Sequence, residues 1–256
     1  MDARLFTAPK PIRPTLLTSP RITPRPAPEM LDLPQPVCSS HQQALVANLD
    51  QELKGECEFS IAEGLAPDFT ELSTEKLFGY SPAQFTVAMG SLFQAITDHN
   101  QYLSCLPTKY TAISIPSISI QDFMQRCEKY MPMESSDIIC VHILIDVYMD
   151  NKRDVFHQLN FHRLFLIASV LVLKWKEDLY YANAYYAKVG GVPTDELNSL
   201  EVDFLFDINF DLYTMRKSYS YYVGLIQDYF RLHRAEIDML IKSREVAETP
   251  SQGLKM

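Results

Sequence analysis

The sequence predicts an all-α fold, with one helical domain over residues 85–240 and a tail at each end. In several stretches apolar residues recur at the spacing that places them on one face of an α-helix. The run 164–173 is apolar on every side of the helix it would form, so we expect it at the centre of a bundle. Alternation typical of a strand is confined to 113–120, where Pro116 interrupts it. For that segment, extended packing against a helix is as good a prediction as a sheet.

Residues 1–84 are expected to be mostly a disordered, proline-rich tail and linker. Nine prolines fall in the first 36 residues, and proline fixes φ and lacks an amide donor, so regular helix is excluded there. Ser19-Pro20 and Thr23-Pro24 match the minimal site of proline-directed kinases, although such dipeptides often arise by chance in proline-rich tails. A short helix at 40–52 is compatible with three apolar residues that share a face.

Three amphipathic helices are predicted before the apolar run, over about 85–100, 119–130 and 135–149. The second should begin near Ser119, with Asp122 in its first turn. For the third, Ser135 and Ser136 are the N-cap candidates.

The central helix is expected to be capped by Asn160. A shorter helix at 181–189 should stop at Gly190-Gly191, because glycine adopts the left-handed conformation at little cost. Thr194 is predicted to cap the next helix, and a last one should cover about 218–231. Residues 241–256 are charged, and we expect them to form a flexible C-terminal tail.

Composition limits the function classes. The net charge is −9 and the pI is near 5.1, which argues against a general nucleic-acid binder, since such proteins need basic surface. The five cysteines are widely spaced, the first residues lack the apolar core of a signal peptide, and the apolar runs are too short to span a bilayer. We therefore expect an intracellular protein, in the cytoplasm and/or nucleus, without nucleic-acid or membrane partners.

No catalytic or metal-binding pattern stands out. His157 and His162 are five residues apart, whereas two ligands on one helix face need a spacing of three or four. Gly190-Gly191 lacks the strand and the lysine of a phosphate-binding loop. The sequence thus predicts a protein that is not an enzyme and has no cofactor or metal.

Several segments resemble a cyclin box, and two of them resemble the P/U-type cyclins, the branch that includes yeast phosphate-pathway cyclins. The general segments are 118–123 (ISIQDF), 145–146 (ID), 160–164 (NFHRL) and 173–178 (LKWKED). The more specific ones are 183–192 (NAYYAKVGGV) and 196–205 (ELNSLEVDFL). The resemblance covers roughly residues 91–213, about half of the chain.

The resemblance implies a single cyclin box of five packed helices, with 164–173 as the third and extra helices at both ends. It implies a non-catalytic subunit that binds and activates a cyclin-dependent protein kinase, in cell-cycle progression or nutrient (phosphate) signalling. The family's kinase-contacting lysine corresponds to Lys174 and its partnering glutamate to Glu201 in the fifth helix. An acidic residue that can face a kinase arginine corresponds to Asp203. The chain is expected to be monomeric before it binds the kinase.

Alternatives stay open at this stage. Taken alone, the residues favour an ordinary surface ion pair between Lys174 and Glu201, worth ~0–1 kcal/mol, and only the resemblance favours contact with a kinase. The Met-Arg-x-x-Leu motif of cell-cycle cyclins is replaced by 115–120 (IPSISI), so their groove for substrate peptides is not expected here. Other candidates are a transcription-initiation factor built on the same helical box, which would need a basic face, and an adaptor without a kinase partner.

Overall fold

The computed structural model describes residues 73–131, 133–176 and 180–248, and within these ranges the chain forms nine helices and no strand. The helices are α2 (Thr74–Phe78), α3 (Pro82–His99), α4 (Ile120–Tyr130), α5 (Ser135–Lys152), α6 (Phe161–Lys176), α7 (Asn183–Gly190), α8 (Thr194–Asp207), α9 (Thr214–Leu232) and α10 (Arg234–Glu248). The predicted all-α class is therefore confirmed. The proline-rich tail, its two Ser/Thr-Pro sites and the helix at 40–52 lie outside the described residues.

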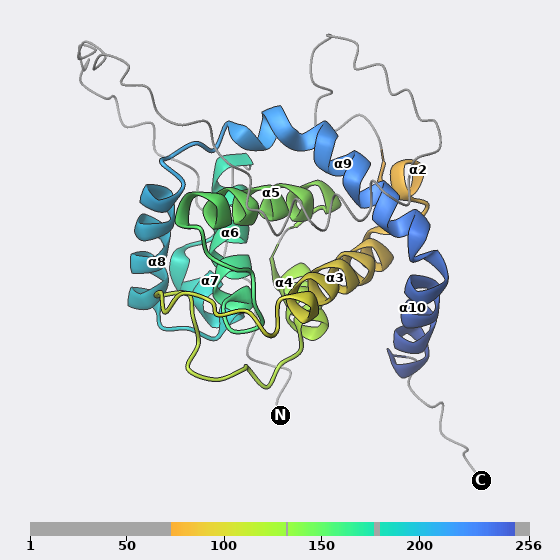
Figure 1. The fold of residues 1–256 in the computed structure, drawn as a ribbon, viewed down its shortest axis with the longest axis horizontal. Coiled ribbons are helices and arrows are strands. Elements are labelled where there is room, and N and C mark those ends of the chain that lie inside the picture. Colours follow the sequence, from red (N-terminus) through yellow and green to blue (C-terminus); the bar gives the residue numbers. More distant parts are fainter. Residues whose placement is uncertain (1–72, 132, 177–179, 249–256) are drawn as a thin grey trace.

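Helix α6 is the buried centre of the bundle (Figure 1). Every residue from 164 to 173 is less than 5% exposed. Helices α4, α5, α7 and α8 all contact α6 and cover it. Burial of each large apolar side chain stabilises the fold by about 1.5–3 kcal/mol, so this one helix organises its neighbours. The prediction of a helix enclosed on every side is confirmed.

Hydrogen bonds from backbone amides to N-cap side chains fix where α3 and α4 begin. Ser81 Oγ accepts a hydrogen bond from the Gln84 amide, and Gln84 Oε1 accepts one from the Ser81 amide, which is a capping box. Helix α3 therefore begins at Pro82, whereas the sequence predicts a start at 85 because Phe85 is the first residue of its large apolar stripe. Ser119 Oγ accepts from the amide of Asp122, so α4 begins where the sequence predicts.

Three predicted caps are displaced by one residue or act differently. The N-cap of α5 is Glu134, and the serines at 135–136 lie in its first turn. The N-cap of α8 is Pro193, which makes Thr194 the first helical residue. Asn160 does precede α6, but its side chain bonds the backbone of the loop before it. The N-caps of α5 and α8 are therefore residue types that the general capping preference does not predict, because the incoming loop sets where each helix begins.

The helical region extends beyond the predicted limits of 85 and 240. Helix α2 lies before the N-terminal limit, and α10 continues to Glu248, into the segment predicted to be a flexible tail. Within α10 the buried residues Ile237 and Ile241 share one face, and the helix packs against α3. Two isoleucines among charged residues form too narrow a stripe to stand out in the sequence.

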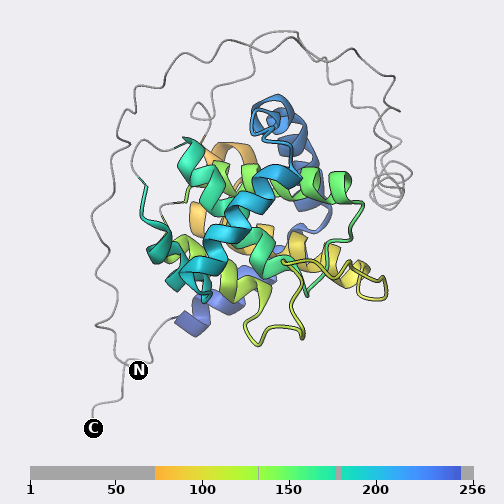
Figure 2. The same ribbon diagram turned by 90° about the vertical axis from the view of Figure 1, so that its left-hand side faces the viewer.

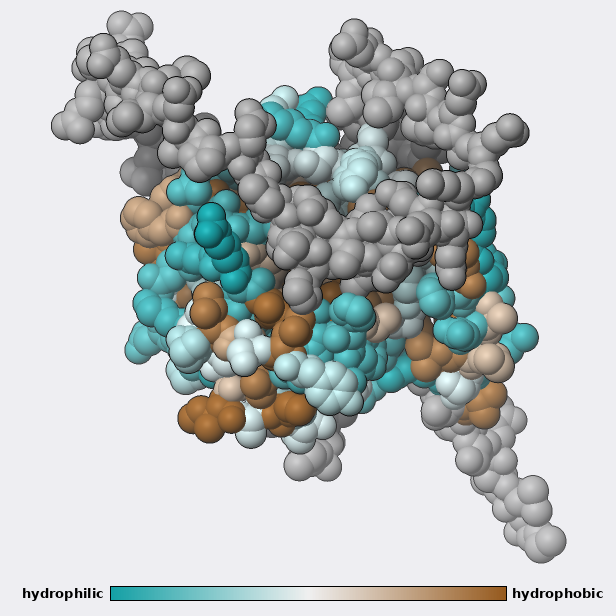
Figure 3. Space-filling view, in the orientation of Figure 1, coloured by the Kyte–Doolittle hydropathy of each residue, from teal (hydrophilic) through white to brown (hydrophobic). Residues whose placement is uncertain are grey.

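The loop between α3 and α4 contains the segment that alternates like a strand. It forms no strand, and it does not pack as an extended segment throughout: Ile113 is fully exposed and Ile115 is 59% exposed. Only after Pro116 does the chain turn inward, with Ile118 half-buried and Ile120 in the core. Apolar residues consequently gather on the surface over this loop, at the lower left of Figure 3.

Candidate functional site

Lys174 lies where the buried run of α6 ends. Leu173 is completely buried, whereas the Lys174 side chain is 23% exposed. The last turn of α6 is held by Lys176, whose Nζ lies 2.8 Å from Asp137 Oδ1 and 3.0 Å from Glu134 Oε2 at the start of α5. Burial lowers the pKa of Lys176, but the two carboxylates outweigh it and raise that pKa above its ordinary value. The ammonium group is therefore retained, and it anchors the turn that presents Lys174.

Lys174 and Glu201 are in direct contact, although 27 positions separate them in the sequence. Lys174 Nζ donates to Glu201 Oε1 at 2.5 Å, and Asn183 Nδ2 donates to Glu201 Oε2 at 2.6 Å. The end of α6 and the start of α7 thus meet the middle of α8 at one carboxylate. The Glu201 side chain is 17% exposed, so the pair lies at the edge of the core and is accessible from one side.

Asp203 faces elsewhere, because two residues along a helix correspond to a rotation of about 200°. Its carboxylate is bonded to Lys109 of the α3–α4 loop and accepts from Ser199 Oγ at 3.1 Å. The hydrogen bond from Lys109 holds the pKa of Asp203 below its ordinary value. The structure therefore brings Lys174 and Glu201 together and places Asp203 on a different side of α8.

The end of α8 exposes two aromatic rings that sequence reasoning missed. Phe206 and Phe210 are 64% and 56% exposed, and their rings pack edge to face with centroids 5.1 Å apart. Phe210 follows Asn209 in the left-handed region, with φ values of 57° and 54°. A phenylalanine in that conformation carries backbone strain. A signal for Phe206 was present in the sequence, since this residue lies outside the buried stripe of its helix.

Helix α8 is braced near both ends. Near its start, Glu196 Oε1 accepts from Arg163 Nε of α6 at 2.9 Å. At its end, Asp207 Oδ1 lies 2.5 Å from Lys152 Nζ of α5. Figure 2 shows α8 crossing the front of the bundle, and in Figure 3 apolar residues lie over its end at the left edge. The face that carries the exposed rings is therefore held rigidly on α5 and α6.

Neither a metal site nor a membrane-spanning helix is present among the described residues. They contain no group of three or more His, Cys, Asp or Glu side chains placed to hold a metal ion. No helix among them is both long and apolar enough to cross a membrane.

Comparison with known families identifies this arrangement of helices. The family model described as Cyclin matches residues 69–212, which is more than half of the chain. This range contains α2 to α8, including the buried α6 and the helix that carries Glu201. The chain belongs to the cyclin family, whose members are regulatory subunits.

Relatives narrow the family to the P/U-type branch. Cyclin-U4-3 of Arabidopsis thaliana is 34% identical over 182 residues, which cover 69% of this chain and 78% of the relative. Cyclin-U4-2 of the same plant is 36% identical over 148 residues, covering 55% of this chain and 68% of the relative. The PHO85 cyclin-like protein psl1 of Schizosaccharomyces pombe is 30% identical over 155 residues, covering 56% and 62%. The resemblance to P/U-type cyclins is confirmed, and a transcription factor or adaptor on the same fold is not favoured.

Proposed function

We propose that this chain binds and activates a cyclin-dependent protein kinase through the end of α6 and the outer side of α8, and itself supplies no catalytic residue. The observation that carries the proposal is the accessible Lys174–Glu201 contact between α6 and α8, together with the exposed rings of Phe206 in α8 and Phe210 just after it. Protein interfaces combine aromatic anchors with positioned charged groups in this way.

Lys174 has hydrogen-bonding capacity left for a partner. An ammonium group has three donors, and the bond to Glu201 Oε1 uses one of them. The remaining donors can bind backbone carbonyls at the C-terminal end of a kinase helix, where such groups lack partners within the helix. Through its hydrogen bond Glu201 orients the Lys174 side chain, and Asn183 in turn orients the Glu201 carboxylate.

Activation would follow from rigidity. The braced α8 and the buried α6 form a rigid surface. A regulatory helix of the kinase that docks on this surface is held in its inward position. That position aligns the kinase's own Lys–Glu ion pair and its metal-binding aspartate. We expect an interface of standard size or larger, roughly 1,600 Å² or more.

Asp203 would contribute separately. A kinase arginine that reaches Asp203 would compete with Lys109, and an arginine can bind a carboxylate through two parallel hydrogen bonds where a lysine offers a point charge. We propose that binding exchanges Lys109 for that arginine. Such a partner would place the chain inside the cell, as a monomer until the kinase binds.

The test is the double variant Lys174→Ala/Glu201→Ala, expressed with an affinity tag in the source cells. We expect it to lose kinase co-purification and the associated kinase activity, while its helical circular dichroism is kept. Removing both members avoids leaving one charge buried without its partner.

Asp122→Ala/Arg244→Ala is the control, because it removes an ion pair between α4 and α10 in which neither α6 nor α8 takes part. It should retain the kinase. If the Lys174/Glu201 double variant still recovers a fully active kinase, these two residues are not the contact. If the unaltered chain recovers no kinase, the proposed function itself is wrong.

A further inference from the structure

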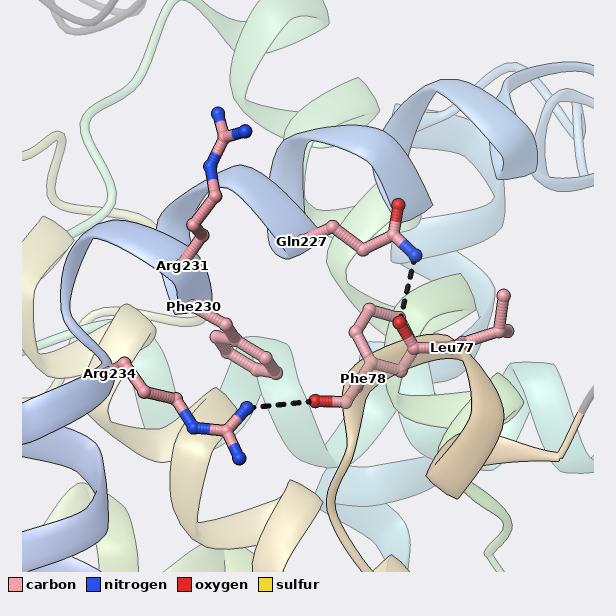
Figure 4. A pocket seen from close by; sticks show the side chains of 6 residues that line it. All are labelled: Leu77, Phe78, Gln227, Phe230, Arg231 and Arg234. Atoms are coloured by element: carbon pink, nitrogen blue, oxygen red, sulfur yellow. Dashed lines mark hydrogen bonds between the residues drawn. The ribbon is translucent and has the colours of Figure 1, made fainter.

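A hollow of about 450 Å³ lies where the end of α2 meets α9 and the turn into α10. Its lining combines apolar, amide and guanidinium groups, from Leu77, Phe78, Gln227, Phe230, Arg231 and Arg234 (Figure 4). Helix α2, which lines this hollow, lies on the opposite side of the bundle from α8 (Figure 1). We call it the α2–α9 groove.

The floor of the α2–α9 groove is aromatic and well supported. Phe78 and Phe230 pack edge to face with centroids 5.7 Å apart, and both are mostly buried in the core. Gln227 Nε2 donates to the Leu77 carbonyl at 2.9 Å, which secures α2 against α9. The floor is thus a fixed apolar surface and does not depend on a ligand to form.

The rim of the groove is basic. Arg231 is 62% exposed and pairs only with Asp228 of its own helix, at 2.9 Å, among the described residues. Exposed pairs of this kind contribute ~0–1 kcal/mol, so the guanidinium remains available to another carboxylate. Arg234 lies over the Tyr80 ring at 4.4 Å, with its Nε 3.4 Å from Asp238 Oδ2, and Figure 4 shows it turned toward the end of α2. Two guanidinium groups above an apolar floor fit a peptide that is both acidic and apolar.

Such a peptide directly precedes α2 in this chain. Residues 55–72 contain five acidic residues and no lysine or arginine, and they also carry apolar side chains. The acidic members are Glu56, Glu58, Glu63, Asp68 and Glu71, and the larger apolar ones are Phe59, Ile61, Leu65, Phe69 and Leu72. Residues 1–25 have the opposite charge, with five basic residues and one acidic residue. We propose that residues 55–72 bind in the α2–α9 groove of the same molecule.

The connection between them is short enough. Helix α2 has five residues and is therefore about 7.5 Å long, at 1.5 Å per residue. Three or four extended residues cover that distance, so a chain that reverses before Ser73 brings residues near Asp68 and Phe69 back to the groove. A short tether gives an effective concentration in the millimolar range, so even a weak site would be filled. Because α2 and α8 lie on opposite sides of the bundle (Figure 1), this contact leaves the proposed kinase-binding face open.

The experiment measures hydrogen–deuterium exchange in residues 60–72 of the full chain. We expect the amides there to exchange at least about threefold more slowly than free peptide. The variant Arg231→Glu/Arg234→Glu, which reverses the charge of the groove, should remove this protection. The variant Glu63→Lys/Asp68→Lys/Glu71→Lys, which reverses the charge of the bound segment, should also remove it. Combining the two sets restores opposite charges and should restore protection.

Lys242→Glu is the matched control, since it reverses an exposed charge on α10 outside the groove and should change nothing in residues 60–72. Unchanged exchange in α9 and α10 of every variant shows that the helices remain folded. Equal exchange of residues 60–72 in all variants, or failure of the combined variant to restore protection, would overturn the proposal. Protection that grows with protein concentration would overturn it in favour of a second copy of the chain.

Discussion

The buried contact between Asp137 and Lys176 fixes the turn that presents Lys174, the proposed kinase contact. The Asp137 side chain has no exposed surface, and burial raises its pKa in spite of the nearby ammonium. Taking charges out of water is costly, and the direct contact with Lys176 offsets that cost. The pair therefore adds little net stability. Its main effect is to fix the position of the last turn of α6.

Lys176→Met should lower the free energy of unfolding by about 3–5 kcal/mol at pH 7, because it leaves the Asp137 carboxylate buried without its counter-charge. Urea denaturation followed by circular dichroism measures this. Adding Asp137→Leu should recover much of the loss, and a double variant as unstable as Lys176→Met would contradict the explanation.

His142 makes stability depend on pH. The imidazole lies between the rings of Phe93 and Tyr222, and its Nδ1 has no hydrogen-bond partner among the described residues. Burial lowers the pKa of His142 below the ordinary 6.5, and the nearby Asp146 carboxylate, which raises this pKa, has the weaker effect. The folded state keeps this imidazole neutral, while the unfolded chain takes up the proton below pH 6.5. Stability is therefore full above that value and falls as the pH drops from 6.5 toward the lowered pKa.

His142→Phe should flatten this part of the stability profile, measured by denaturation between pH 7.5 and 5. The pKa of His162 is also lowered by burial, so some slope will remain. A profile identical to that of the unaltered chain would show that His142 is not responsible.

At the scale of elements, helices α6 and α7 approach so closely that a side chain does not fit between them. A Cβ added at Gly190 would lie 2.1 Å from Leu166 Cδ2, and Leu166 is itself packed in the core. The neighbouring Gly191 meets nothing within 4 Å, but its φ of 72° is left-handed. Two adjacent glycines are thus required for different reasons, the first for space and the second for backbone conformation.

Gly190→Ala should destabilise the fold by about 1–3 kcal/mol through overpacking, and Gly191→Ala by about 1–2 kcal/mol through backbone strain. Thermal or urea unfolding separates the two causes when each change is repeated with Leu166→Ala. The smaller Leu166 side chain should reduce the effect of Gly190→Ala and leave that of Gly191→Ala unaltered. Equal coupling for both glycines would refute this distinction.

Over the whole molecule, the residues that stabilise the core differ from those that form the proposed kinase-binding face. Helix α6 gives its apolar run to the interior, while the exposed rings at the end of α8 contribute little to burial. Phe210 is held in a conformation that glycine adopts more easily. Stability and binding should therefore respond in different ways to a change at this residue.

Phe210→Gly should leave the free energy of unfolding within about 1 kcal/mol of its original value, because relief of backbone strain offsets the lost contact with Phe206. Kinase affinity should fall about 30-fold, which corresponds to loss of an aromatic anchor worth about 2 kcal/mol. Titration calorimetry with the purified kinase measures the second quantity. Unchanged affinity would remove Phe210 from the proposed face.

The sequence by itself determined the helical class, the buried position of residues 164–173, the start of α4 and the family, because these follow from local periodicity, capping chemistry and motif. Only the tertiary structure decided that α10 packs against α3 and that Lys109 of the α3–α4 loop is the partner of Asp203. Each of these depends on which surface a neighbouring element covers. That information comes from contacts between distant segments, which no local pattern in the sequence contains.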